Sequence, residues 1–320
     1  MVEAGRKIFV KTKYCKRICF IAALWGLIVS AQPNDAPRPA AQNPSPMVEK
    51  TRAHERVPQQ KYPGVEFKIS AILPKAVDVF IPQKRGNSKT FDLLLHFHGA
   101  GFISQYAAMK HRNALVTATI NLGGGSGVYN NAFEDSTKFP AVIAALNDSL
   151  EKKLVRPITL RKIILSGFSA GYGAIRKIIS TPQNFAAVDA ILLLDGIHAS
   201  YVPERRVLAE GGQIDSSGVA AFIRFATEAA RKNSNKKFLV THSEIFPGTF
   251  VSTTEATDFI LQALGMKRQP LLKRGPLGMQ QLSAARQQHF AVLGFAGNTA
   301  PDHVDHLHAL DYFLKVLEKI

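Results

Sequence analysis

Apolar runs of strand length alternate with segments of helical spacing along most of this chain. The runs lie at 76–82, 91–99, 114–122, 163–165, 189–196, 236–243 and 289–297. Between them, apolar residues recur at helical spacing, as in the sets Val219, Phe222, Ile223 and Ala226, and Leu307, Leu310, Leu314 and Leu317. Strands without a polar face, separated by helices, are typical of a mostly parallel sheet covered on both faces. The pattern therefore predicts an α/β fold.

One of these runs ends in a motif with chemical meaning. The run Ile163-Ile164-Leu165 continues into the pentapeptide 167–171, Gly-Phe-Ser-Ala-Gly, and a helical segment begins at Tyr172. A serine between a strand and a helix must turn sharply, and small flanking glycines give the backbone room to do so. The turn would expose the Ser169 hydroxyl and direct the amide of Ala170 toward a developing oxyanion. A plain Gly/Ser turn has the same composition, but the flanking strand and helix favour a nucleophile elbow.

The first 31 residues have the composition of a secretory signal peptide. A basic segment precedes the apolar stretch 18–29, and Val29-Ser30-Ala31 supplies small residues suited to cleavage. The apolar stretch is short for a membrane span, which favours a cleaved signal over an anchor. Both cysteines, Cys15 and Cys19, fall inside this leader. We therefore expect a periplasmic or secreted mature chain without disulfides or cysteine metal sites.

The next segment, 32–64, is rich in Pro, Ala, Asn and Gln and predicts a disordered tether. The remainder, 65–320, has the length of one domain. The formal charge of the chain is +16, and removal of a leader with six Lys/Arg and one Glu leaves 16 − 5 = +11. This balance favours weak attraction to an anionic envelope surface. No nucleic-acid-binding motif is evident, so nucleic acid is not an expected partner.

A candidate oxyanion turn precedes the serine in the chain. The strand 91–97 ends in His98, followed by Gly99, Ala100 and Gly101. A turn of small residues at this point would let a backbone amide face the same position as the amide of Ala170. His96 lies on the same strand face as His98, and we interpret it as a structural residue that braces the turn.

Together, the His-Gly-Ala-Gly turn, the Gly-Phe-Ser-Ala-Gly elbow and a late histidine resemble the α/β-hydrolase superfamily. The resemblance extends from about Val65 to Ile320. It implies an α/β-hydrolase fold and a Ser-acid-His triad that acts without a cofactor through a covalent acyl-enzyme. It also implies that the base follows the last strand, where the segment 294–310 offers three histidines. We favour His303, with His306 as the alternative, and expect His308 to serve packing or solvent contact.

The surroundings of these histidines allow two further interpretations. Asp302 is a candidate cap for the last helical segment, which would place His303 in its first turn. The cluster Asp302, His303, Asp305 and His306 also contains metal-ligand residue types. Nothing elsewhere in the sequence completes such a metal site, so we expect no metal.

Two residues compete for the role of the triad acid. The superfamily usually places the acid one strand later than 189–196, which points to Glu244. Asp195, however, ends an entirely apolar strand, and a buried carboxylate there needs a partner such as an imidazole N–H. We favour Asp195 slightly and keep both. His198, Tyr129, Tyr201 and Phe168 are expected to line the pocket.

Two segments have no assigned chemistry. The loop Gly-Gly-Gly-Ser-Gly at 123–127 lacks the Lys-Ser/Thr ending of a phosphate loop, which argues against nucleotide binding. The basic segment 266–281 is either a lid or, preferably, a surface excursion.

The predicted function is hydrolysis of a carboxylic ester, on a small-molecule or polysaccharide substrate, by a serine esterase. A peptidase, a non-catalytic binding protein on the same fold and a metal-dependent hydrolase remain as alternatives.

Overall fold

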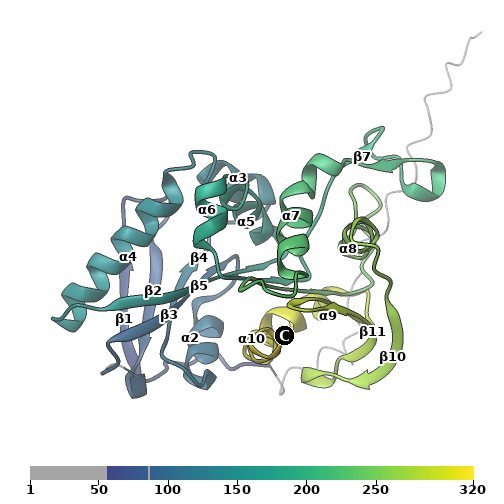
Figure 1. Cartoon of the computed structure of the whole chain (residues 1–320). Helices are drawn as coiled ribbons and strands as arrows, with labels where there is room; N and C mark the ends of the chain where they lie inside the picture. The colour runs from purple at the N-terminus through teal and green to yellow at the C-terminus, as the bar shows by residue number, and fades with distance from the viewer. Residues whose placement is uncertain (1–55, 86) are drawn as a thin grey trace, which may run out of the picture. The chain divides into compact units, whose positions relative to one another are not determined.

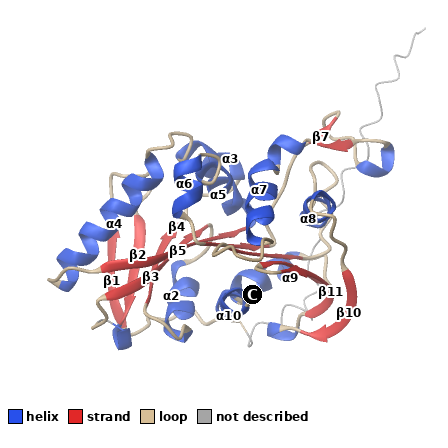
Figure 2. Cartoon of the chain, viewed as in Figure 1, coloured by secondary structure: helices blue, strands red, loops and turns tan. Residues whose placement is uncertain are grey.

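The computed structural model describes residues 56–85 and 87–320, which build a ten-stranded sheet with helices on both faces (Figures 1 and 2). The strands are β1 (Gly64–Ile69), β2 (Val77–Pro82), β3 (Thr90–Phe97), β4 (Leu115–Ile120), β5 (Thr159–Phe168), β6 (Ala190–Leu194), β9 (Lys237–His242), β10 (Gln269–Arg274), β11 (Gln280–Gln287) and β12 (Phe290–Phe295). Strands β7 (Tyr201–Val202) and β8 (Gln213–Ile214) form a separate antiparallel pair.

The helices are α2 (Gly101–Lys110), α3 (Ser126–Ala132), α4 (Lys138–Leu154), α5 (Tyr172–Ile178), α6 (Pro182–Ala187), α7 (Ala220–Ala229), α8 (Thr253–Ala263), α9 (Ala300–His308) and α10 (Leu310–Lys319). Short 3-10 turns include η2 (Ser169–Gly171) and η4 (Ser216–Gly218). None of the helices in the described part of the chain combines the length and apolar content that crossing a bilayer requires. The predicted leader and most of the predicted tether lie outside the described residues.

The order of strands identifies the fold. The sheet runs β1-β2-β4-β3-β5-β6-β9-β12-β11-β10. Strands β4, β3, β5, β6, β9 and β12 are mutually parallel, and β2 is antiparallel to both of its neighbours. This is the α/β-hydrolase order, so the predicted fold class is confirmed. All the parallel strands end at one edge of the sheet, where ligands bind in open α/β folds.

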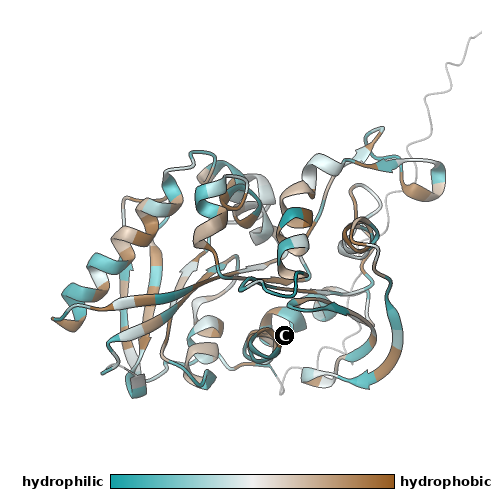
Figure 3. Ribbon diagram, in the orientation of Figure 1, coloured by the Kyte–Doolittle hydropathy of each residue, from teal (hydrophilic) through white to brown (hydrophobic). Residues whose placement is uncertain are grey.

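Two apolar cores lie on opposite faces of the sheet. One contains side chains of α4, α5, α7 and α8, and the other contains side chains of α2, α9 and α10. Strand β3 alternates between them, with Leu93 and Leu95 in the first and Leu94 in the second. Figure 3 shows the apolar residues concentrated along the middle of the sheet. Burial of the strands on both faces explains their apolar runs.

Among the strands that the sequence pattern did not predict, β1 and β10 are the two edges of the large sheet. In β1 the residues are mostly exposed, and β10 is exposed along almost its whole length. Exposed strands need no apolar pattern, so they leave little trace in the sequence. Part of the segment 266–281 forms β10 and the start of β11, so it is a regular, exposed part of the sheet at its edge and not an irregular segment.

Two predicted boundaries need correction. Val57 and Tyr62 are buried in the core beside α2 and α10, so the folded region begins before residue 65. The apolar face at 307–317 belongs to two helices, because α9 ends at His308 and α10 begins at Leu310. The interruption changes the direction of the chain between the segment that carries His303 and the C-terminal helix.

Candidate active site

Ser169 lies in a strained turn between β5 and α5. Its backbone adopts φ +46°, in the left-handed region, and its side chain is only partly buried. For a residue other than glycine this conformation costs about 1–2 kcal/mol, which the surrounding packing must offset. The strained turn lifts the hydroxyl out of the sheet toward solvent, as the pentapeptide predicts.

Close backbone packing around the turn requires glycine at two positions. A Cβ on Gly171 would lie 2.1 Å from the carbonyl oxygen of Phe97, and one on Gly196 would lie 2.3 Å from the carbonyl oxygen of Ser169. Any larger residue would push the turn away from β3 or from the loop after β6. These two glycines therefore seat Ser169 between the ends of the neighbouring strands.

The carboxylate that meets the late histidine is Asp195, directly after β6. Its Oδ2 atom lies 2.8 Å from Nδ1 of His303, although the two residues are 108 positions apart in sequence. The Asp195 side chain is 4% exposed and that of His303 is 25% exposed. A buried carboxylate thus holds a more accessible imidazole, the arrangement that orients a general base.

Asp195 is held by further donors. The Ser243 amide donates to Oδ1 at 2.9 Å, and the Ser243 hydroxyl donates to Oδ2 at 2.6 Å. Burial alone would raise the pKa of the Asp195 carboxyl. The neighbouring imidazoles of His306 and His303 and the bonds from Ser243 outweigh burial and hold that pKa below its usual value. Asp195 is therefore ionised at neutral pH and can bind an N–H on His303.

His303 is positioned by the start of α9. Thr299 is the N-cap, and Asp302 is the third helical residue; each side chain binds the backbone of the other in a capping box. Asp302 was expected to be the cap itself, so the helix begins three residues earlier than predicted. His303 follows Asp302 at the end of the first turn.

Phe168 connects the turn at Ser169 with His303. The rings of Phe168 and His303 have centroids 4.5 Å apart, and Phe168 directly precedes the serine. Within residues 56–85 and 87–320, no hydrogen bond joins Ser169 Oγ to His303. Such catalytic bonds are often long in ligand-free sites and tighten when substrate binds.

Glu244, the alternative acid, is directed elsewhere. It is exposed, and its Oε2 accepts a 3.2 Å hydrogen bond from the amide of Gly297. The Glu244 amide in turn donates to the Gly297 carbonyl at 2.8 Å. Glu244 therefore ties the loop after β9 to the loop after β12 and does not contact His303.

The predicted oxyanion donors lie on adjacent strand ends. Phe97 of β3 pairs with Gly167 of β5, so the turn at Gly99–Gly101 and the elbow leave the sheet at the same level. His98 stacks on Phe168 with ring centroids 5.8 Å apart, which joins the two turns. Ala100 caps α2, and Ala170 is in the first turn of η2. Amides at such positions lack partners inside their own helix and are available to an oxyanion.

The other histidines of α9 have structural partners. His306 is buried, and its Nδ1 lies 2.8 Å from the Thr241 hydroxyl. Burial lowers the pKa of His306 to about 4, so this ring is neutral at pH 7. His308 lies near Phe102, with ring centroids 6.2 Å apart. Neither makes the contact with the Asp195 carboxylate that His303 makes.

The acidic residues of the candidate metal cluster on α9 each have another partner. Asp302 closes the capping box, and Asp305 binds Arg56 at 3.0 Å. In the described portion of the chain, no group of three or more His, Cys, Asp or Glu side chains is arranged to hold a metal ion.

A hollow of about 500 Å³ opens beside Ser169. Its walls include Ser169, Ala170, Tyr172, His198 and Phe250, together with Gly125, Ser126, Arg176, Ala199 and Ser200. His198 lines the hollow, as the sequence predicted. Phe168 was also expected to line it, but its ring is buried and contacts the rings of His98 and His303 instead.

Two other expected lining residues are part of the support. Tyr129 is buried and its hydroxyl lies 3.0 Å from Nδ1 of His98, while the Tyr201 hydroxyl donates to Glu255 at 2.8 Å. Neither lines the hollow at Ser169.

Sequence reasoning missed the glycine-rich loop at 123–127 as part of the site. Gly125 and Ser126 line the hollow, and the Tyr172 hydroxyl donates to Ser126 Oγ at 3.1 Å. The sequence did indicate this role, because the loop directly follows the apolar run that becomes β4 and loops after parallel strands lie at the ligand-binding edge. Arg176 was also missed, and only its place on the helix after the elbow could have indicated it.

The solved structures compared below resemble this chain at low sequence identity. No protein-family model matches the chain, and no curated protein matches its sequence. A fungal esterase from Rhizomucor miehei is 13% identical over 88% of this chain and 91% of its own, with a TM-score of 0.45. An S-formylglutathione hydrolase from Agrobacterium tumefaciens is 10% identical over 82% and 97%, with a TM-score of 0.46. Est1E from Butyrivibrio proteoclasticus is 10% identical over 80% and 100%, with a TM-score of 0.41. The fold assignment stands on the strand order and not on these matches.

Proposed function

We propose that this protein is a serine hydrolase that cleaves a carboxylic ester through an acyl-enzyme on Ser169. The observation that supports the proposal most strongly is the 2.8 Å contact between Asp195 and His303 beside a strained, solvent-accessible serine. A histidine oriented by a buried carboxylate next to an exposed hydroxyl is the arrangement that activates a serine nucleophile.

In the acylation step, His303 Nε2 accepts the proton of Ser169 as Oγ attacks the ester carbonyl carbon. Asp195 accepts the Nδ1–H hydrogen bond and stabilises the imidazolium that forms. The Ala170 amide and an amide of the Gly99–Gly101 turn stabilise the negative carbonyl oxygen. The ester C–O bond then breaks, and His303 gives its proton to the departing alcohol.

In the deacylation step, the same groups act on water. His303 removes a proton from water, the resulting hydroxide adds to the acyl carbon, and the proton returns to Ser169 Oγ as the acid leaves. Every proton transfer passes through His303, and the sum is one ester and one water converted to one acid and one alcohol. No step needs a cofactor.

The test combines a Ser169→Ala variant with a fluorophosphonate probe and a p-nitrophenyl ester. The parent protein should form a covalent adduct at Ser169 and hydrolyse the ester, and the variant should do neither. Replacement of a half-buried serine outside the site, Ser88→Ala, is the matched control and should leave both readouts unchanged. Equal turnover by parent and Ser169→Ala would refute the assignment, and an unlabelled, inactive but folded parent would favour a non-catalytic binding protein.

We also propose that the protein is exported with cleavage after Ala31. The support is the sequence pattern of residues 1–31 alone. Mass spectrometry of the N-terminus of exported protein tests it, and a retained Met1 would contradict it.

A further inference from the structure

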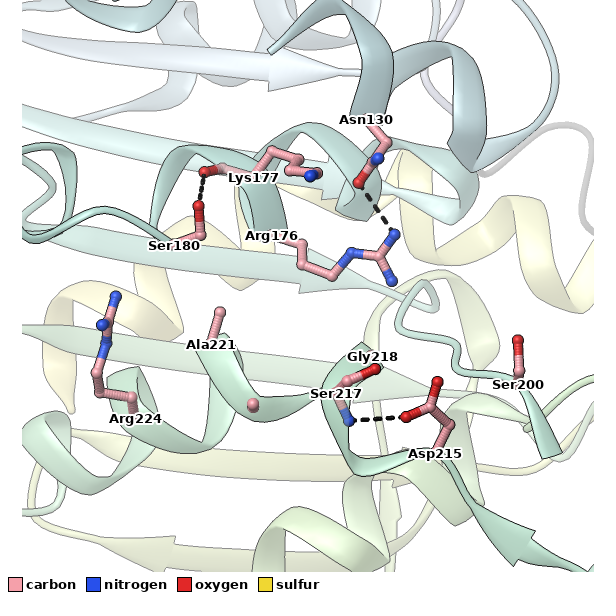
Figure 4. A pocket seen from close by; sticks show the side chains of 11 residues that line it. Asn130, Arg176, Lys177, Ser180, Ser200, Asp215, Ser217, Gly218, Ala221 and Arg224 are labelled. Carbon is pink, nitrogen blue, oxygen red and sulfur yellow. Dashed lines mark hydrogen bonds between the residues drawn. The ribbon is translucent and has the colours of Figure 1, made fainter. Parts of the chain in front are cut away.

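A second hollow, about 610 Å³ in volume, adjoins the hollow at Ser169 (Figure 4). Arg176 and Ser200 line both of them. The second hollow extends from there along α5 toward the start of α7, where Gly218, Ala220 and Ala221 form a wall. A substrate held at Ser169 can therefore extend past Arg176 into the second hollow.

The walls of this second hollow carry more positive than negative charge. The charged lining residues are Arg176, Lys177, Arg224 and Asp215. Lys177 is paired with Glu134, at 2.6 Å between Nζ and Oε2. Arg224 donates to the carbonyl of Ile179 and lies over the Phe185 ring. Of these three cations, Arg176 alone has neither a carboxylate partner nor a main-chain acceptor within the described residues.

The contacts of Arg176 leave much of its guanidinium free. Nη2 donates to Asn130 Oδ1 at 3.0 Å, and Nη1 lies 3.8 Å from where a Cβ on Gly218 would stand. Among the described residues, no carboxylate lies within ion-pair distance of it. Asp215, on the opposite side in Figure 4, instead accepts the Ser217 amide at 3.0 Å.

The side chain of Arg176 points toward the hollow at Ser169, although it also lines the second hollow. It lies on α5, seven positions after Ser169, and side chains on a helix lean toward the N-terminal end. The guanidinium accordingly stands over the ring of Tyr172, four residues earlier, at 5.6 Å. Ser169 and Arg176 line the same hollow, so one ligand in that hollow can contact both the nucleophile and the guanidinium.

We propose that Arg176 binds a carboxylate of the substrate, so that the preferred substrates are esters that carry a carboxylate within roughly 10 Å of the ester carbonyl, the span of seven residues of helix. The proposal rests on the proposed ester hydrolysis and names its substrate class. A planar guanidinium pairs with a carboxylate through two parallel hydrogen bonds, and the half-buried position of Arg176 limits screening by water. The absence of an ion-pair partner leaves that role to the ligand.

Matched substrate pairs test the proposal. Mono-p-nitrophenyl adipate and suberate carry a carboxylate on the acyl side, and p-nitrophenyl hexanoate and octanoate are neutral esters of equal length. A second pair, 4-acetoxybenzoate and its methyl ester, places the charge on the alcohol side. We expect the ratio of kcat/KM, anionic over neutral, to fall about tenfold in Arg176→Gln for at least one pair. Arg176→Lys should retain part of the ratio.

Two variants make the test specific to this hollow. Arg231→Gln removes the same charge from an exposed position outside the hollow and should leave the ratio unchanged. Asp215→Asn removes the opposing carboxylate and should raise the ratio. High salt should lower the ratio in the parent and have little effect in Arg176→Gln. Circular dichroism and thermal unfolding establish that each variant folds.

The outcomes separate this inference from the proposed function. If the parent hydrolyses the neutral esters but Arg176→Gln keeps the parent ratio for both pairs, the carboxylate site is wrong and the hydrolase stands. If the parent hydrolyses no ester, the proposed function fails. Adipate binding then tests the carboxylate site independently of turnover. Adipate should bind the double variant Ser169→Ala/Arg176→Gln about tenfold more weakly than it binds Ser169→Ala. Equal binding in both would overturn the inference.

Discussion

Asp195 and Glu244 are carboxylates that follow neighbouring parallel strands, yet the structure gives them opposite surroundings. Asp195 is buried, receives two bonds from Ser243 and contacts His303. Glu244 is exposed, and its side chain accepts a hydrogen bond from the backbone amide of Gly297 in the adjoining loop. Position at the end of a strand therefore does not by itself give a carboxylate an imidazole partner. Burial, fixed donors and an imidazole partner are what distinguish Asp195.

The largest effect that this comparison predicts is on turnover. Asp195→Asn should lower kcat/KM for an ester about 10³- to 10⁴-fold, because an amide does not hold His303 in the required tautomer. Glu244→Gln, at the matched position after β9, should change kcat/KM less than about twofold. Steady-state kinetics of both variants decides the matter. Equal, mild losses would leave the proposed triad without an acid.

A smaller effect should follow from removing a donor to Asp195. Ser243→Ala removes the 2.6 Å bond to Oδ2 and should lower kcat/KM about tenfold. Loss of that donor raises the pKa of Asp195, so activity should decline at a higher pH than in the parent as the solution is acidified. The pH profile is the decisive measurement. An unchanged profile with a tenfold loss would indicate a merely structural role.

The buried imidazole beside Asp195 should make stability depend on pH. The pKa of His306 is lowered to about 4 by burial, against about 6.5 in the unfolded chain. The unfolded chain therefore binds the extra proton first, and stability present above pH 6.5 is lost as the pH falls toward 4. This group contributes a slope of about 1.4 kcal/mol per pH unit in that range.

The variant His306→Gln tests that slope, with His306→Asn in reserve if the first does not fold. Urea unfolding at pH 6.5 and pH 5 should show a smaller loss of free energy in the variant than in the parent. Burial also lowers the pKa values of His96 and His242, to about 3 and about 4, so the variant should retain part of the dependence. The same slope in parent and variant would contradict the prediction.

The smallest effect belongs to the exposed carboxylate. Glu244→Ala should reduce the free energy of unfolding by about 0.5 kcal/mol or less, because its bond to the Gly297 amide is exposed to solvent. Thermal unfolding measures this change. A loss of several kcal/mol would mean that the loop contact contributes to the core and that the contrast with Asp195 is overstated.

The sequence by itself determined the elements whose physics is local or fully buried. Runs without a polar face predicted the parallel strands, because only strands covered on both faces need them. The elbow was predicted from a strand, glycines, a serine and a helix within ten residues. The residues that a sharp turn requires are neighbours in sequence, so a local pattern reveals them. Exposed edge strands such as β1 and β10 left no such pattern and were not predicted.

Only the tertiary structure decided which distant residues meet. The sequence favoured Asp195 over Glu244 only slightly, because each follows a buried strand. The structure separated them, because α9 carries His303 to the loop after β6. The same holds for the 123–127 loop and for Arg176, which reach the hollow through the order of strands and the lean of a helical side chain. Contacts between residues far apart in sequence are set by strand order and helix packing, and local residue patterns do not encode them.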